Sequence, residues 1–223
     1  MVVLSLTGCA PRYYDPGERL VNQESVGEYL FAVQGVYPRN CRLTQRVLVH
    51  FRGGEFDMIG YLFLRPEGEW SAVALGDMGI ELFHLRWTNG QGEVIRQPES
   101  MPPGPIRDGV IADIQHLFGR KHAHPAYLTQ QARGRVGLVL QISQDVLEVY
   151  DFVGRGKELA GSRTIADGVI VREATFEGAA MYSGAADPLS KRIVLHNYEW
   201  GYSMEVEPLS VELADQPQHT SED

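Results

Sequence analysis

The stretch Leu43–Arg65, LTQRVLVHFRGGEFDMIGYLFLR, decides the fold class. Its first part, Leu43–Phe51, is rich in β-branched residues and alternates in polarity, which is typical of a strand. A short turn, Arg52-Gly53-Gly54-Glu55, separates it from a second apolar run, Phe56–Arg65. Two such runs joined by a glycine-containing turn predict an antiparallel hairpin.

The second run of this hairpin carries apolar residues on both of its faces. Phe56, Met58, Leu62 and Leu64 share one face, and Ile59, Tyr61 and Phe63 share the other. A strand with one face in water would alternate cleanly between apolar and polar residues. We therefore expect both faces to contact a helix, a second sheet or an apolar ligand. The candidate cavity residues on this strand are Met58, Leu62 and Leu64.

Similar apolar runs joined by glycine turns continue along the chain, with Asn89-Gly90 as the strongest hairpin signal. The predicted strands are Glu69–Leu75, Ile80–Trp87, Gln91–Arg96, Val136–Ser143, Val146–Val153, Lys157–Ile165, Val169–Phe176, Arg192–Tyr198 and Tyr202–Val206. Near the start, Tyr29–Val36 fits either the end of a helix or a first strand. The order of meander, helix and second meander predicts one curved antiparallel sheet with a helix laid against it.

The helix is predicted at Ile106–Phe118, where apolar residues recur at helical spacing. The apolar stripe consists of Ile106, Val110, Ile111, Ile114, Leu117 and Phe118. Asp108 and Asp113 are expected towards the opposite, polar side. Two interpretations stay open: a core helix that covers the sheet, or a lid over an apolar cavity on its concave face.

The overall charge narrows the classes of partner. The 223 residues carry a net charge of −9 with a pI near 5.3. This argues against nucleic-acid binding and against electrostatic adhesion to anionic lipid, since both need clustered Lys and Arg. Membrane association would need an anchor or an apolar surface. The sequence contains no stretch near the ~18–20 apolar residues of a spanning helix.

Motifs for catalysis or metal binding are missing from the sequence, which has no G-x-S-x-G, H-E-x-x-H, C-x-x-C or Walker pattern. His122 and His124 are two residues apart, but a zinc site needs further ligands, so loop histidines fit better. We expect a protein that is not an enzyme and has no cofactor or metal. A hydrolase remains a third hypothesis, and it requires two titratable groups that converge inside a cleft.

The first residues, MVVLSLTGCAP, include Leu6-Thr7-Gly8-Cys9, which resembles a bacterial lipobox. That resemblance implies a signal peptide remnant at 1–8 and an acylated Cys9, with a polar tether over 9–28. Ala10 resembles the sorting state of outer-membrane lipoproteins. The alternative is that Val2–Leu6 forms an N-terminal strand. An acylated Cys9 cannot form a disulfide, which leaves Cys41 as a lone thiol.

A second resemblance is carried by five segments, the first of which is the hairpin described above. They are LTQRVLVHFRGGEFDMIGYLFL, GIELFHLRW, GVIADIQHLF, RTIADGVIVREATF and RIVLHNYEWGYSMEVE. They resemble a family of bacterial lipoproteins related to the LolA/LolB outer-membrane lipoprotein carriers, often encoded beside fatty-acid-synthase-like or aryl-polyene pathways. The stretch Arg120–Lys157 departs from that pattern. The resemblance implies an unclosed antiparallel half-barrel with helices over its concave side. It implies one LolB-like β-rich domain at 29–213, followed by a disordered tail at 214–223.

Together these patterns predict a monomeric lipoprotein of the bacterial envelope, anchored in the outer membrane and facing the periplasm. Its expected partners are hydrophobic, since the half-barrel would bind or transfer an acyl, lipoprotein or polyene-lipid chain. The alternative is a structural or assembly lipoprotein that docks a protein partner. In that case its own side chains would fill the interior.

Overall fold

A computed structural model of the protein describes residues 11–20, 24–34, 40–97, 99, 104–119, 125–131, 134–154, 158–178 and 191–213. Within these ranges, the side chains of residues 24, 25, 34 and 105–107 are not described. The predictions for residues 1–10, including Cys9, for His122 and His124, and for the tail at 214–223 lie outside the described residues.

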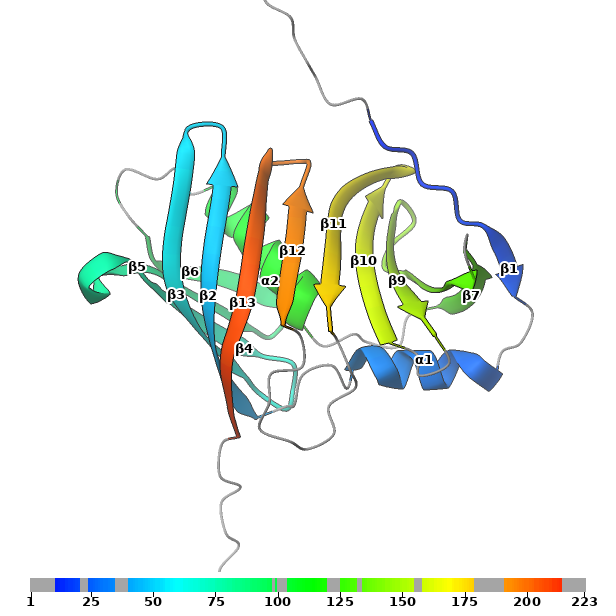
Figure 1. Cartoon of the computed structure of the whole chain (residues 1–223), viewed down its shortest axis with the longest axis horizontal. Helices are drawn as coiled ribbons and strands as arrows, with labels where there is room; N and C mark the ends of the chain where they lie inside the picture. Colours follow the sequence, from blue (N-terminus) through cyan, green and yellow to red (C-terminus); the bar gives the residue numbers. More distant parts are fainter. Residues whose placement is uncertain are drawn as a thin grey trace, which may run out of the picture.

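The described residues form one 13-stranded antiparallel sheet with helices on its concave side (Figure 1). The helices are α1 (Glu24–Gln34) and α2 (Ile111–Phe118), with a 3-10 turn η1 (Asp77–Gly79) and a π-helical segment η2 (Pro105–Val110). The strands are β1 (Glu18–Leu20), β2 (Cys41–Phe51), β3 (Gly54–Leu64), β4 (Trp70–Leu75), β5 (Glu81–Thr88), β6 (Gln91–Arg96), β7 (Ala126–Gln130), β8 (Val136–Gln141), β9 (Val146–Val153), β10 (Glu158–Ala166), β11 (Val169–Glu177), β12 (Arg192–Asn197) and β13 (Tyr202–Leu213).

The two predicted meanders are joined through their outermost members. The strand order is β1-β7-β8-β9-β10-β11-β12-β13-β2-β3-β4-β5-β6, so the last strand, β13, pairs with β2. The edge strands β1 and β6 do not pair with each other in the described part of the chain. The sheet is therefore open, and the predicted curved antiparallel class is confirmed.

The predicted hairpin turns have the backbone geometry that their residues indicate. Asn89 and Gly90 have φ values of 54° and 76°, and Asp167 and Gly168 have 51° and 76°. Two successive residues with positive φ match the twist of the flanking strands, and Asn-Gly and Asp-Gly adopt this conformation readily. The turns at these positions set the register of β5–β6 and β10–β11.

Several predicted boundaries were wrong. Strand β13 continues past Val206 to Leu213, because a bulge between Pro208 and Ser210 absorbs the proline and lets pairing with β2 resume. The predicted single helix begins as the π-helical segment η2 and becomes α-helical only at Ile111. The segment around Tyr29 is helical, within α1.

Residues 11–20 belong to the fold, although the sequence predicted a tether there. The Tyr14 N–H donates to the Gly168 carbonyl at 3.0 Å, and the Arg12 carbonyl accepts from the Ile170 N–H at 2.9 Å. Strand β1 then pairs with β7. The polar composition concealed this because the segment lies on the convex face, where Tyr14 covers a small apolar cluster that contains Ile165.

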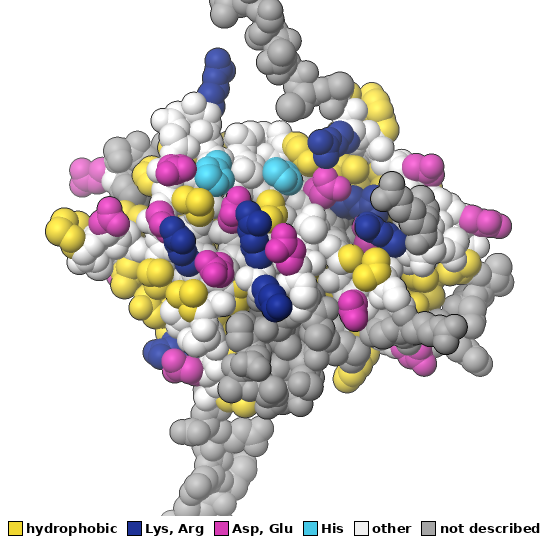
Figure 2. All heavy atoms as spheres, viewed as in Figure 1, with side chains coloured by type: hydrophobic (Ala, Val, Ile, Leu, Met, Phe, Trp, Pro, Cys, Tyr) yellow, Lys and Arg dark blue, Asp and Glu magenta, His cyan; other side chains and the backbone are white. Residues whose placement is uncertain are grey.

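Charged side chains gather over the middle of the convex face, on β2, β3, β12 and β13 (Figure 2). Arg46 lies 2.5 Å from Asp57 across β2 and β3, and Arg192 lies 2.6 Å from Glu205 across β12 and β13. Such exposed pairs contribute little stability, but they keep this face in water. The main apolar core therefore lies on the concave side.

Candidate ligand-binding cavity

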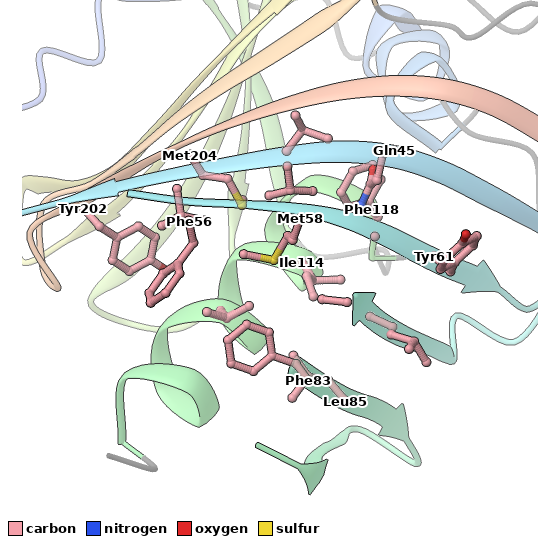
Figure 3. A pocket seen from close by; sticks show the side chains of 18 of the residues that line it. Gln45, Phe56, Met58, Tyr61, Phe83, Leu85, Ile114, Phe118, Tyr202 and Met204 are labelled. Carbon is pink, nitrogen blue, oxygen red and sulfur yellow. The ribbon is translucent and has the colours of Figure 1, made fainter. Parts of the chain in front are cut away.

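A cavity of ≈ 330 Å³ lies between α2 and the concave face of the sheet (Figure 3). Its walls come from β2, β3, β4, β5 and β13 on one side and from η2 and α2 on the other. No charged residue is among the described residues that line it. The lining residues are Gln45, Val47, Val49, Phe51, Phe56, Met58, Gly60, Tyr61, Ala72, Val73, Ala74, Phe83, Leu85, Val110, Ile114, Phe118, Trp200, Tyr202, Met204 and Val206.

One end of the cavity is exposed and aromatic. Phe51 and Phe56 flank the β2–β3 turn, their rings stack at 5.2 Å, and the side chains are 40% and 42% exposed. Trp200 in the β12–β13 turn is 38% exposed. The other end is enclosed by buried residues such as Leu85 and Phe118. The cavity therefore opens in a mouth at these two hairpin turns and becomes more deeply buried towards Leu85 and Phe118.

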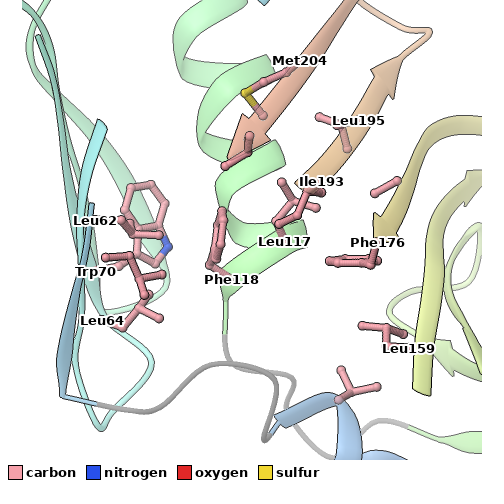
Figure 4. Packing of buried hydrophobic residues seen from close by; sticks show 14 of the residues in the cluster. Leu62, Leu64, Trp70, Leu117, Phe118, Leu159, Phe176, Ile193, Leu195 and Met204 are labelled. Carbon is pink, nitrogen blue, oxygen red and sulfur yellow. The ribbon is translucent and has the colours of Figure 1, made fainter. Parts of the chain in front are cut away.

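The apolar stripe of the helix divides between two environments. Val110, Ile114 and Phe118, spaced four residues apart, line the cavity. Ile111 and Leu117 are buried in the core. The single sheet curves around α2, and the core contacts strands on both sides of the helix (Figure 4). The helix is thus both a core element and one wall of the cavity.

The candidate strand residues divide in the same way. Met58 lines the cavity, whereas Leu62 and Leu64 are packed in the core near Trp70 (Figure 4). On the opposite face of the same strand, Phe63 is 39% exposed, so that face is only partly covered. Ile106 lies in η2, and its side chain is outside the described part of the structure.

A buried polar network fixes α2 beside the mouth. Asp113, which is fully buried, accepts hydrogen bonds from Arg172 Nε at 2.8 Å, from Asn197 Nδ2 at 3.0 Å and from the Tyr202 hydroxyl. Arg172 Nη2 also donates to Glu199 at 3.0 Å. These partners come from β11, β12, the β12–β13 turn and β13. The network therefore ties one side of α2 to the sheet.

Asp113 was predicted on the polar side of the helix, and its neighbours are polar, but that side is buried rather than in contact with water. The sheet curves around the helix, so the side opposite the apolar stripe is covered as well. Burial raises the pKa of Asp113, while Tyr202, Arg172 and Asn197 act in the opposite direction. The pKa of Tyr202 is also raised, first by burial and then by the neighbouring Asp113 carboxylate. Asp113, paired with a cation and two neutral donors, therefore has a structural role: it holds α2 against the sheet.

A second polar cluster has the residue types of a hydrolytic triad. His116 Nε2 lies 2.8 Å from Ser162 Oγ, and its Nδ1 lies 3.2 Å from Thr164 Oγ1 and 3.6 Å from Glu148. Ser162 and His116 are buried, and none of the four lines the cavity. In a hydrolytic triad the serine must contact the substrate. Ser162 is not among the described residues that line the cavity, so this cluster is not placed to act on a ligand bound there. This cluster joins α2 to β9 and β10.

Three other observations concern the described residues alone. They contain no group of three or more His, Cys, Asp or Glu placed to hold a metal ion. None of their helices is long and apolar enough to cross a membrane. The Cys41 side chain, at the start of β2, is buried.

Much of the lining was not predicted, although part of it carries a signal in the sequence. The inward row of β2, which includes Val47 and Val49, follows from the alternation of Leu43–Phe51. Trp200, Tyr202 and Met204 come from the far end of the chain. They meet the cavity only because β13 pairs with β2. A pairing between distant strands leaves no local pattern in the sequence.

Comparison with protein families identifies the family of this chain. The family described as "Protein of unknown function (DUF3261)" matches residues 42–210, which is most of the chain. The chain belongs to the DUF3261 family. A comparison with curated proteins gave no match.

Solved structures show how the DUF3261 chain is folded. A LolA superfamily protein from Nitrosomonas europaea is similar with a TM-score of 0.54 at 11% identity, over 89% of this chain and 96% of that one. A DUF1329 family protein from Desulfovibrio piger ATCC 29098 has a TM-score of 0.47 at 11% identity, over 90% of this chain and 94% of that one. The first similarity confirms the predicted LolA-like open half-barrel.

Proposed function

We propose that this protein is an envelope lipoprotein that binds or transfers a single hydrophobic chain, acyl or polyene, in the cavity under α2. The observation that supports the proposal most directly is the ≈ 330 Å³ cavity within a LolA-like fold, whose described lining residues are all uncharged. Pockets for small ligands measure roughly 300–1,000 Å³, so this volume suits one slender chain. Burying a chain there gains roughly 25 cal/mol per Å² of apolar surface removed from water.

The same lining residues determine which chemical groups of a ligand can be buried inside the cavity. An ionised carboxylate or phosphate has no cation to pair with among the described lining residues, and burying an unpaired charge is very unfavourable. A charged head group would therefore remain at the mouth, near Phe51 and Trp200. Release to an acceptor needs only a difference in affinity, not a chemical step.

The position of residues 11–20 supports an orientation for this lipoprotein. Pro11 lines a surface groove together with Phe51 and Tyr202, which also line the cavity. Cys9 precedes Pro11 by two residues, a reach of about 7 Å. Acyl chains on Cys9 would therefore hold the bilayer close to the mouth. The exposed aromatic rings at the mouth suit the membrane interface.

The alternative, an assembly lipoprotein that only docks a protein partner, predicts that side chains fill the space under the helix. The cavity that remains beside Val110 and Ile114 favours ligand binding instead. The proposed location is the outer membrane, with the domain in the periplasm. It rests on the resemblance of Leu6–Cys9 to a lipobox and on Ala10.

Native mass spectrometry of the full chain, released gently from membranes, tests the proposed function. We expect one non-covalent hydrophobic ligand per protein, lost on denaturation, whereas acyl groups on Cys9 remain attached. Empty protein should take up hexadecanoic acid in a one-to-one ratio. A protein that is always empty and ignores fatty acids and acylated peptides would contradict the proposal.

Replacing Cys9 with alanine is expected to move the protein from the membrane fraction to the soluble fraction. The reason is that two or more acyl chains anchor stably, at about 0.8 kcal/mol per buried CH₂. Metabolic labelling with an alkyne-tagged palmitate should also be lost. Fractionation after carbonate washing and gel fluorescence give the two readouts.

The matched control for this prediction is Cys41→Ala. Cys41 is the other cysteine of the chain and is a buried thiol inside the sheet. Its replacement should leave both labelling and membrane attachment intact. If Cys9→Ala still fractionates with the membrane and still takes up label, the anchor is not at Cys9.

A further inference from the structure

We infer that the cavity is built for a chain whose buried end carries a hydroxyl group, and that Gln45 binds this hydroxyl. The inference rests on the proposed function and adds a chemical class of ligand to it. It comes from one polar side chain inside the apolar lining of the cavity.

Gln45 lies in the inward-facing row of β2. Its neighbours in that row, Leu43 and Val47, are buried and apolar. The Gln45 side chain lines the cavity near Phe118 (Figure 3) and is only 8% exposed. Its Oε1 is buried and has no hydrogen-bond partner among the described residues.

The strand pairing explains why Oε1 of Gln45 finds no donor on the two neighbouring strands. On one side Gln45 pairs with Gly60, which has no side chain. On the other it pairs with Pro208, whose ring carries no polar group. The helix contributes Phe118 at this level. Neither cross-strand neighbour therefore offers a side-chain group that could donate to Oε1.

An amide buried without a partner is destabilising, and a ligand that supplies the missing hydrogen bonds is favoured for that reason. The carboxamide of Gln45 presents an acceptor and a donor side by side. A hydroxyl can donate to Oε1 and accept from Nε2, whereas a methyl end can do neither. An ionised group is unsuitable because none of the described lining residues is a cation.

The distance between Gln45 and the mouth assigns the hydroxyl to the far end of the chain. Gln45 and Phe51 are six residues apart on β2, which corresponds to roughly 20 Å along a strand. A lipid chain spans about half of a ~30 Å hydrocarbon core, which is roughly 15 Å. A chain with its charged end at Phe51 therefore directs its other end towards Gln45 and comes to within roughly 5 Å of it.

The test compares two probes that differ only at that end, hexadecanoic acid and 16-hydroxyhexadecanoic acid. Their dissociation constants are measured by isothermal titration with the wild-type full chain and with Gln45→Leu. We expect the ratio of the two constants to change by about tenfold in favour of hexadecanoic acid in the variant. Gln45→Met serves as a second variant of similar shape if the first folds poorly.

The outcomes separate this inference from the proposed function. If both probes bind and Gln45→Leu leaves their ratio unchanged, the hydroxyl assignment is overturned, as it would be if a water molecule satisfied Gln45. The proposed function then stands. If neither probe nor any other chain binds the wild-type protein, the proposed function fails and this inference fails with it.

Two controls keep the comparison specific. Met58→Leu changes another lining residue without altering its polarity, and it should leave the ratio of constants as in the wild-type protein. In NMR spectra, the side-chain amide signals of Gln45 should shift with 16-hydroxyhexadecanoic acid well beyond their shift with hexadecanoic acid. Equal shifts with both probes would contradict a hydrogen bond at this amide.

Discussion

Replacing Arg172 with methionine is expected to lower the free energy of unfolding by about 3–5 kcal/mol. Arg172 is the cation beside Asp113, at 2.8 Å, and Asp113 has no exposed surface. Without the guanidinium, the carboxylate must either remain charged in the interior or take up a proton. Both are costly, and Asn197 and Tyr202 compensate only in part.

Urea denaturation followed by circular dichroism measures this loss, and Arg192→Met is the matched control. Arg192 lies on the neighbouring strand and makes an ion pair of similar length, 2.6 Å to Glu205, but on the solvated convex face. Its replacement should shift the urea midpoint little, since exposed pairs contribute little. Equal shifts for the two variants would mean that the Asp113 network does not stabilise the fold.

The sequence predicted the strands well because their signal is local. Alternation in Leu43–Phe51 and the turns at Asn89-Gly90 and Asp167-Gly168 each arise within a few residues. The same signal was too weak for β1 and β7. Strand β1 is three residues long, and β7 follows a stretch without clear alternation, so long-range pairing determines both.

The cavity was predictable only in part, for the same reason. Helical spacing brought Val110, Ile114 and Phe118 together as one stripe, and strand alternation gave Met58. Neither pattern indicates which members of a stripe line empty space and which pack, because that depends on the curvature of the sheet. Asp113 shows the limit most clearly. A polar residue on the far side of a helix usually contacts water, but here the sheet covers it.

Replacing Ala74 with phenylalanine is expected to lower the affinity for hexadecanoic acid by roughly 100-fold, with little change in stability. Ala74 lies on β4 between Gly60 and Phe83, and it lines the cavity. A cavity of about 150 Å³ is enough for a benzene ring, so one added ring occupies much of the ≈ 330 Å³. A chain that loses about four buried CH₂ groups, at ~0.8 kcal/mol each, loses roughly that much affinity.

Thr175→Phe adds a phenylalanine side chain at an exposed position on β11, outside the cavity lining, and should bind hexadecanoic acid like the wild-type protein. Displacement of a fluorescent fatty acid measures binding, and urea denaturation shows that both variants are folded. A folded Ala74→Phe protein that binds with wild-type affinity would place the ligand elsewhere on the molecule. Loss of binding in Ala74→Phe alone would locate the chain under α2, because the two variants differ only in where the ring is added.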